Sequence, residues 1–331
     1  MLSRLHVILP FSLTVPEGET YPIYSYVDEG YEIRIYPPAK SDQPTPGIDV
    51  DELFIDEKPG FQANALRIDF VKDSFDRQVG IECDPSYDLI QRTVNFFLRR
   101  LRFVVRGFQI SLLNFPQLSW HIRYLDDDET ELPTTEGLVR GRGARAFNLS
   151  WIALTRQVWD DIHALPVDYA PPEWDSLFLD ALAALPNVGP SIVLAATSLD
   201  VFISYILDAL AQKSVIPQHQ RHWINNREWL REPALEEQFD DLLKILSGSS
   251  LKENQTLWEA FKNLKTARNS FVHEGLAQIG KKPVTEAEAR KLVHQTAEIV
   301  KFIKTKMPDE MRWPEYQHTI NIQIGKKLFG K

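Results

Sequence analysis

The chain has 331 residues, with 44% hydrophobic residues, 25% charged residues and a formal net charge of -9. This length predicts two domains, and the composition excludes collagen-like, low-complexity and wholly disordered proteins. The negative charge argues against binding nucleic acid through bulk charge, so any site for a polyanion must be local.

Cysteine usage and the N-terminus indicate a reducing compartment. Cys83 is the single cysteine, so no internal disulfide is expected. The first residues run directly into a strand-like pattern, without the apolar region and cleavage site of an export signal. The most apolar segment, residues 191–210, carries Asp200 at its middle, where a charge opposes insertion into a bilayer. We therefore expect a cytoplasmic protein with no membrane span.

Residues 1–165 are predicted to form a mainly antiparallel β domain that contains a helix. Apolar residues alternate with period two, most clearly at residues 5–9 and 66–70, as in strands that bury one face. Across residues 87–105 the apolar positions recur at helical spacing, so a helix is expected to pack on the sheet. Residues 118–124 return to the strand pattern.

A proline-rich connection at residues 166–172 separates this domain from a helical one, residues 173–331, which includes a C-terminal tail. Apolar stripes predict helices within residues 192–210, 239–246, 257–271 and 292–303. Thr285 and Glu288 form a capping-box pattern before the last of these helices. The tail alternates like a strand at residues 319–324, and such a strand can pair with the first domain. The expected fold class is therefore α+β.

One predicted helix carries a charge where packing is expected. The apolar stripe that runs from Leu257 to Leu264 reaches Arg268 one helical step later. A half-buried guanidinium needs a carboxylate or an anionic ligand, because leaving such a charge unpaired destabilises a protein by about 3–5 kcal/mol. Asp200 interrupts the most apolar helix and is the predicted partner.

Two further polar residues follow on the same helix. Asn269 and His273 are four residues apart and share a face, so the amide is predicted to orient the imidazole. Arg268 lies about 140° around the helix from His273, but its long stem can bring the guanidinium round. Histidine moves protons at neutral pH, and arginine stabilises a phosphorane-like charge. The three residues therefore suit cleavage of RNA by its own 2′-hydroxyl, which requires no metal.

The sequence Arg268-Asn269, followed by His273 in a helix that ends near Gly275, resembles the Arg-x(4–6)-His motif of the HEPN superfamily (higher eukaryotes and prokaryotes nucleotide-binding). The resemblance covers roughly residues 175–306. It implies a helical domain that forms a homodimer, in which two copies of the motif make one endoribonuclease site that uses no metal or cofactor. It implies that Arg268 and His273 are catalytic and that Asn269 is the polar residue after the arginine. Asp200 corresponds to an acidic residue of an earlier helix, where the family often has Glu.

The resemblance also implies a biological setting and a rival function. RNA is the implied partner, and the first domain is expected to be a sensor or regulator that responds to a trigger ligand or protein. Family members of this kind act in defence against phage or in toxin systems. The alternative is a non-catalytic HEPN-like protein that binds a partner or a nucleotide through the same pocket. A third interpretation gives Arg268 and His273 a purely structural role at a helix end.

Other features carry weaker predictions. The basic loop at residues 140–145 either tracks phosphates or is an ordinary exposed loop. His219 and His222 lie three residues apart, but a metal site needs a third fixed ligand. Three tryptophans are either base-stacking platforms or core residues: Trp223, Trp229 and Trp258. The remaining histidines share no sequence pattern: His6, His121, His163, His294 and His318.

Overall fold

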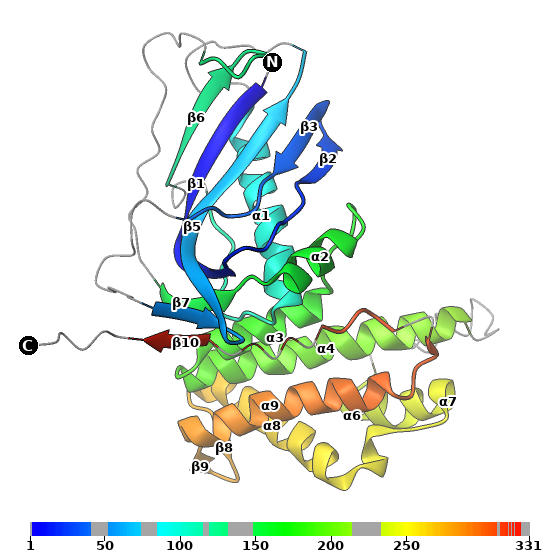
Figure 1. The fold of residues 1–331 in the computed structure, drawn as a ribbon. Coiled ribbons are helices and arrows are strands. Elements are labelled where there is room, and N and C mark those ends of the chain that lie inside the picture. The colour runs from blue at the N-terminus through cyan, green and yellow to red at the C-terminus, as the bar shows by residue number, and fades with distance from the viewer. Residues whose placement is uncertain are drawn as a thin grey trace, which may run out of the picture. The chain divides into compact units, whose positions relative to one another are not determined.

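The structure is a computed structural model that describes residues 2–40, 52–73, 85–114, 119–131, 148–213, 233–309, 312–316, 318, 320 and 322–325. It divides into two compact units: Met1–Ala170 together with Tyr316–Lys331, and Pro171–Glu315. The first unit holds an antiparallel sheet and the second is mainly helical (Figure 1), so the α+β fold class is confirmed.

The first unit is built on one sheet. Its strands are β1 (Leu2–Pro16), β2 (Tyr24–Asp28), β3 (Tyr31–Ile35), β4 (Glu52–Ile55), β5 (Lys58–Val71), β6 (Ser119–Leu125), β7 (Asn148–Ala153) and β10 (Ile322–Gly325). The strand order β10-β4-β5-β1-β6 places the long strand β1 between β5 and β6, and both pair with it antiparallel. β7 pairs with β1 in parallel, and β3 joins the β2–β3 hairpin to β5.

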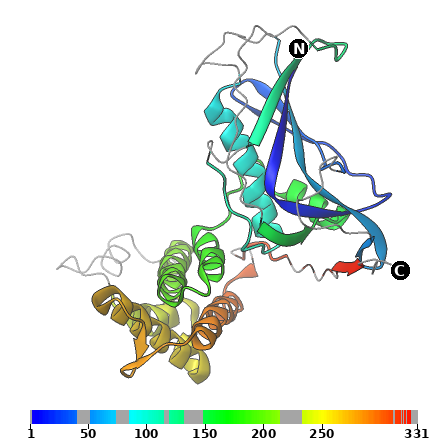
Figure 2. The same cartoon turned by 90° about the vertical axis from the view of Figure 1, so that its left-hand side faces the viewer.

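Period-two alternation decides which face of this sheet is buried. In the first part of β1, up to Pro10, odd-numbered residues such as Leu5 and Val7 are buried and even-numbered ones are partly exposed, whereas residues 11–16 are all buried. The helix α1 (Tyr87–Val104) lies along one face of the sheet (Figure 2). It and α2 (Arg156–Ala164) contribute apolar side chains to the same core as the strands. α1 is the helix predicted over residues 87–105, and Ser86 caps its first turn.

The C-terminal tail contains a strand that pairs with the first unit, as the alternation in its sequence allowed. Sequence patterning placed it with the helical domain, but Tyr316–Lys331 belongs to the first unit. The reason is strand pairing: Ile322–Gly325 pairs antiparallel with Glu52–Ile55. The two strands are far apart in sequence, so the alternation of the tail identifies a strand but not its partner.

The second unit packs several helices around a central one. Its elements are α3 (Glu173–Ala184), α4 (Val188–Lys213), α6 (Leu235–Glu237), a π-helical turn (Gln238–Leu242), α7 (Leu243–Ser247), a 3-10 turn (Leu251–Glu253), α8 (Gln255–Glu274), the short hairpin β8 (Gln278–Ile279) and β9 (Lys282–Pro283), and α9 (Glu286–Lys304). α3, α8 and α9 all contact α4. Among the described residues, α4 alone is long and apolar enough to cross a membrane, and half of its most apolar stretch is buried inside the unit.

Candidate functional site

The predicted motif lies in the last two turns of α8. Asn254 caps the start of this helix by accepting a hydrogen bond from the Leu257 N–H at 3.2 Å. Gly275 ends it with a φ of 75°, a conformation that glycine adopts without a Cβ clash, and its N–H donates to the Phe271 carbonyl at 2.8 Å. The helix therefore stops directly after the turn that carries His273.

Arg268 borders the apolar stripe of α8, as predicted. Its side chain is half-buried, and Nη1 donates a hydrogen bond to Oδ1 of Asn269 at 3.0 Å. Its Nε is fully buried and meets no acceptor among the described residues. A buried donor without a protein partner opposes folding unless a water or a ligand accepts from it, so this nitrogen is available to a ligand.

Asp200 lies across from this guanidinium on α4. Burial raises the pKa of the Asp200 carboxyl above its usual value, and the positive charges of Arg268 and Lys265 act in the opposite direction without reversing the shift. Arg268 and Asp200 therefore attract each other. In the described residues, no hydrogen bond or ion pair within 4.0 Å joins the two side chains. Aspartate reaches one methylene less far than glutamate, which accounts for electrostatic attraction without direct contact.

Asn269 does not orient His273, contrary to the prediction. The spacing of four residues permits that contact, but the carboxamide oxygen accepts from Arg268 instead. A charged donor forms the stronger hydrogen bond and lies next to Asn269 in sequence, so it takes the oxygen. The His273 side chain is exposed and makes no hydrogen bond within the described part of the chain.

The structure thus brings together three of the four predicted residues, with the fourth on the same helix end. We call Arg268, Asn269 and Asp200 the polar cluster of α8 and α4: Arg268 and Asn269 are hydrogen-bonded, and Asp200 is near enough to be affected by the charge of Arg268. His273 is exposed at the end of α8. Two apolar residues flank that imidazole: Val272 is 52% exposed and Leu276 is 48% exposed. The cluster can hold a phosphate through the guanidinium, and the imidazole can exchange protons with a group bound beside it.

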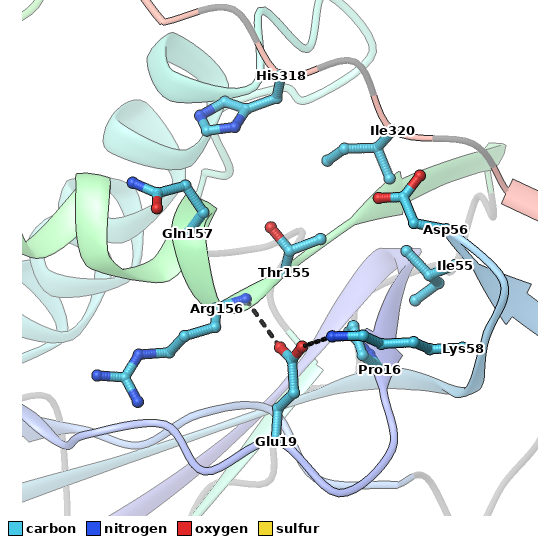
Figure 3. Close-up of a pocket in the computed structure, with 10 residues that line it drawn as sticks. All are labelled: Pro16, Glu19, Ile55, Asp56, Lys58, Thr155, Arg156, Gln157, His318 and Ile320. Carbon is cyan, nitrogen blue, oxygen red and sulfur yellow. Dashed lines mark hydrogen bonds and ion pairs between the residues drawn. The ribbon is translucent and has the colours of Figure 1, made fainter.

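A separate cavity of about 330 Å³ lies in the first unit, lined by residues from β1, β4, β5, α2 and the C-terminal segment. Figure 3 shows Glu19 accepting hydrogen bonds from Lys58 Nζ at 3.0 Å and from the Arg156 N–H at 3.1 Å. Burial raises the pKa of Glu19, but these hydrogen bonds outweigh it and hold the pKa below its usual value. Nε2 of His318, on the same cavity, lies 3.0 Å from a carboxylate oxygen of Asp161. Glu19, Lys58 and Arg156 are paired with one another, and their scattered positions give no signal in the sequence.

The weaker sequence predictions have mixed outcomes. Trp258 is a core residue, buried against Phe261 with ring centroids 5.4 Å apart, and not a stacking platform. The other features lie outside the described residues: residues 140–145, Cys83, His219, His222, Trp223 and Trp229.

Comparisons of the chain with protein families, with curated proteins and with solved structures found no match.

Proposed function

We propose that the helical unit is a HEPN-like, metal-independent endoribonuclease. The observation that carries the proposal is the polar cluster of α8 and α4: a half-buried Arg268 with an unpartnered Nε, a carboxylate across from it, and a histidine one turn further along the helix. A purely structural helix end does not need this combination, because a buried charge and a buried unpaired donor both oppose folding.

The chemistry assigns one task to each residue. Arg268 holds the scissile phosphate and stabilises the charge that builds up as the 2′-hydroxyl of the RNA attacks phosphorus. Asn269 fixes the guanidinium through its 3.0 Å hydrogen bond. Asp200 attracts the same guanidinium from α4, which makes it a positioning residue. His273 accepts the 2′-hydroxyl proton or donates a proton to the leaving 5′-oxygen. The products are a 2′,3′-cyclic phosphate and a 5′-hydroxyl.

We propose that two copies of the chain form one composite active site. Within one helix, Arg268 and His273 lie about 140° apart, so the two groups do not converge by spacing alone. The exposed Val272 and Leu276 beside His273 form an apolar face, and we propose that a homodimer covers it. The composite site then contains two histidines, one for each proton transfer. Leu276→Glu is expected to shift the protein to a monomer in sedimentation velocity and to lower cleavage with it. A wild-type protein that is monomeric at assay concentrations contradicts the dimer.

Cleavage of RNA in excess EDTA tests the assignment. His273→Ala and Arg268→Ala are each expected to lower the cleavage rate at least about 100-fold, the usual contribution of a general acid or base for His273 and of a group that stabilises transition-state charge for Arg268. His294→Ala is the matched control, because His294 is also an exposed histidine on a helix of the same unit. Undiminished cleavage by both site variants rejects the assignment.

The rival function, binding without catalysis, is favoured by one observation: His273 makes no described contact with Arg268 or Asn269. Under that alternative the biological effect of the protein survives His273→Ala but not a charge placed at Val272 or Leu276. If the protein is an endoribonuclease, His273→Ala abolishes its biological effect. Growth inhibition on expression in a cell, wild type beside His273→Ala, separates the two functions.

A further inference from the structure

Two rows of polar side chains cross the face of the sheet opposite the core. The first, which we call the cation row, runs in register across β3, β5, β1 and β6 and consists of Arg34, Asp69, Arg4 and Arg123. The second, the ring row, runs across β5, β1 and β6 and consists of Arg67, His6 and His121. The rows are two residues apart along each strand, which separates them by about 7 Å.

The ring row offers flat surfaces. The imidazoles of His6 and His121 are stacked, with ring centroids 4.8 Å apart and planes 7° from parallel. The guanidinium of Arg67 lies 3.8 Å from the centroid of the Tyr36 ring. His121 is exposed, and His6 and Arg67 are partly exposed. Unpaired bases stack on aromatic rings and on guanidinium planes of this kind.

The arginines beside the rings are held in place by one buried carboxylate. Asp69, only 1% exposed, accepts from Nε and Nη2 of Arg4 at 3.0 and 3.1 Å, and from Nε and Nη2 of Arg67 at 3.2 and 2.6 Å. Nη1 of each guanidinium stays outside these bonds. Both arginines are therefore oriented before any ligand arrives, which lowers the entropy lost on binding.

Four arginines surround the rings, and each of them also has an acidic partner. Burial and the nearby positive groups, His121 and the arginines at positions 123, 67 and 4, lower the pKa of His6 to about 4. One acidic group of this face, Asp69, lies within the cation row. Of the others, Glu32 pairs with Arg34, Glu129 with Arg4, and Glu131 is 3.8 Å from Arg123. The Arg123 side chain is 55% exposed.

We propose that this face of the sheet binds a single-stranded polynucleotide, with bases stacked on the ring row and phosphates along the cation row. Stacking and charge lie in parallel strips on one open surface, which is the arrangement that unpaired nucleotides require. A duplex hides its base faces and cannot use the ring row. The surface is in the first unit and is independent of the cleavage proposed for α8.

Fluorescence anisotropy measures the binding. The protein is the full chain carrying His273→Ala, so that cleavage does not disturb the titration, at physiological ionic strength. The probes are labelled single-stranded RNA and DNA of about 12 nucleotides. The test variant adds His121→Ala and Arg123→Gln. The matched control adds His294→Ala and Arg290→Gln, because Arg290 is 54% exposed and is also paired with a glutamate.

The test variant is expected to bind at least about fivefold more weakly than the control, the loss typical of one stacking platform. Tighter binding of RNA or of DNA identifies the natural strand. The proposal is overturned if the parent protein binds neither strand, if test and control variants bind equally, or if a duplex of the same length binds as tightly as the single strands.

A second measurement uses no substitution in the sheet. Phosphates placed along the cation row offset the positive field around His6. A base stacked on the ring row would bury His6 further and act in the opposite direction. The pKa of His6, followed through the imidazole proton signals in NMR, is therefore expected to move from about 4 when the oligonucleotide is added. A pKa that does not move at saturation places the strand elsewhere and overturns the proposal.

Discussion

Replacing Gly189 with alanine tests how α4 and α8 pack beside the candidate site. A methyl group added at Gly189 would lie 2.0, 2.4 and 2.4 Å from three ring atoms of Phe271. Carbon atoms in contact are about 3.5–4.0 Å apart, so the ring or the helix must move. Overpacking of this kind typically destabilises by about 1–3 kcal/mol. Alanine also meets Pro190, because the residue before a proline is hindered in the helical region.

The helical preference of alanine over glycine offsets this loss by no more than about 1 kcal/mol. We therefore expect Gly189→Ala to lower the free energy of unfolding of the helical unit by about 1–3 kcal/mol. Urea denaturation followed by far-UV circular dichroism measures the loss.

A double-mutant cycle shows whether the Phe271 ring is the cause. Phe271→Leu removes the far end of the ring, so Gly189→Ala in that background is expected to lose less stability. The coupling energy between the two changes should be about 1 kcal/mol or more. A Gly189→Ala protein as stable as wild type, or the same loss in both backgrounds, would refute this description of the α4–α8 contact.

Three further predictions concern buried and half-buried polar groups. Burial raises the pKa of Asp200, so its charged carboxylate opposes folding at pH 7, and Asp200→Asn is expected to raise the free energy of unfolding there. The gain should vanish at about pH 3, where Asp200 of the wild type is protonated. Burial lowers the pKa of His163 to about 4, so wild type should lose stability as the pH falls from about 6.5 toward 4. In urea denaturation over this pH range, His163→Phe should lose less stability than wild type. Arg100→Met removes a buried guanidinium that donates to the carbonyls of Leu165, Pro166 and Val167. The free energy of unfolding, measured by thermal denaturation, should fall by about 3 kcal/mol, and a variant as stable as wild type contradicts this role.

Features set by near neighbours were predictable from the sequence. The Thr285 side chain accepts from the Glu288 N–H, and the Glu288 carboxylate accepts from the Thr285 N–H at 2.8 Å, which confirms the capping box. The helix expected to end near Gly275 does end there, with Gly275 in the left-handed conformation, and Gly248 ends α7 in the same way. These interactions join residues within four positions, so one sequence window contains all the information they need.

Features set by strand register were not predictable. His6 and His121 are far apart in sequence, and alternation gives only the face on which each lies. Their stacking depends on the register of β1 against β6, which places these two residues opposite each other. The partner of the C-terminal strand β10 was hidden for the same reason. Asn269 illustrates a third limit. Helical spacing allowed a hydrogen bond to His273, but the carboxamide oxygen accepts from the neighbouring Arg268 instead.

The ends of the RNA products test the chemistry proposed for α8 most directly. The account predicts 2′,3′-cyclic phosphate and 5′-hydroxyl ends from wild type and from His294→Ala in excess EDTA, identified by mass spectrometry. Neither His273→Ala nor Arg268→Ala should produce these ends above background. Products with 3′-hydroxyl and 5′-phosphate ends, or cyclic phosphate produced at the wild-type rate by His273→Ala, would contradict it.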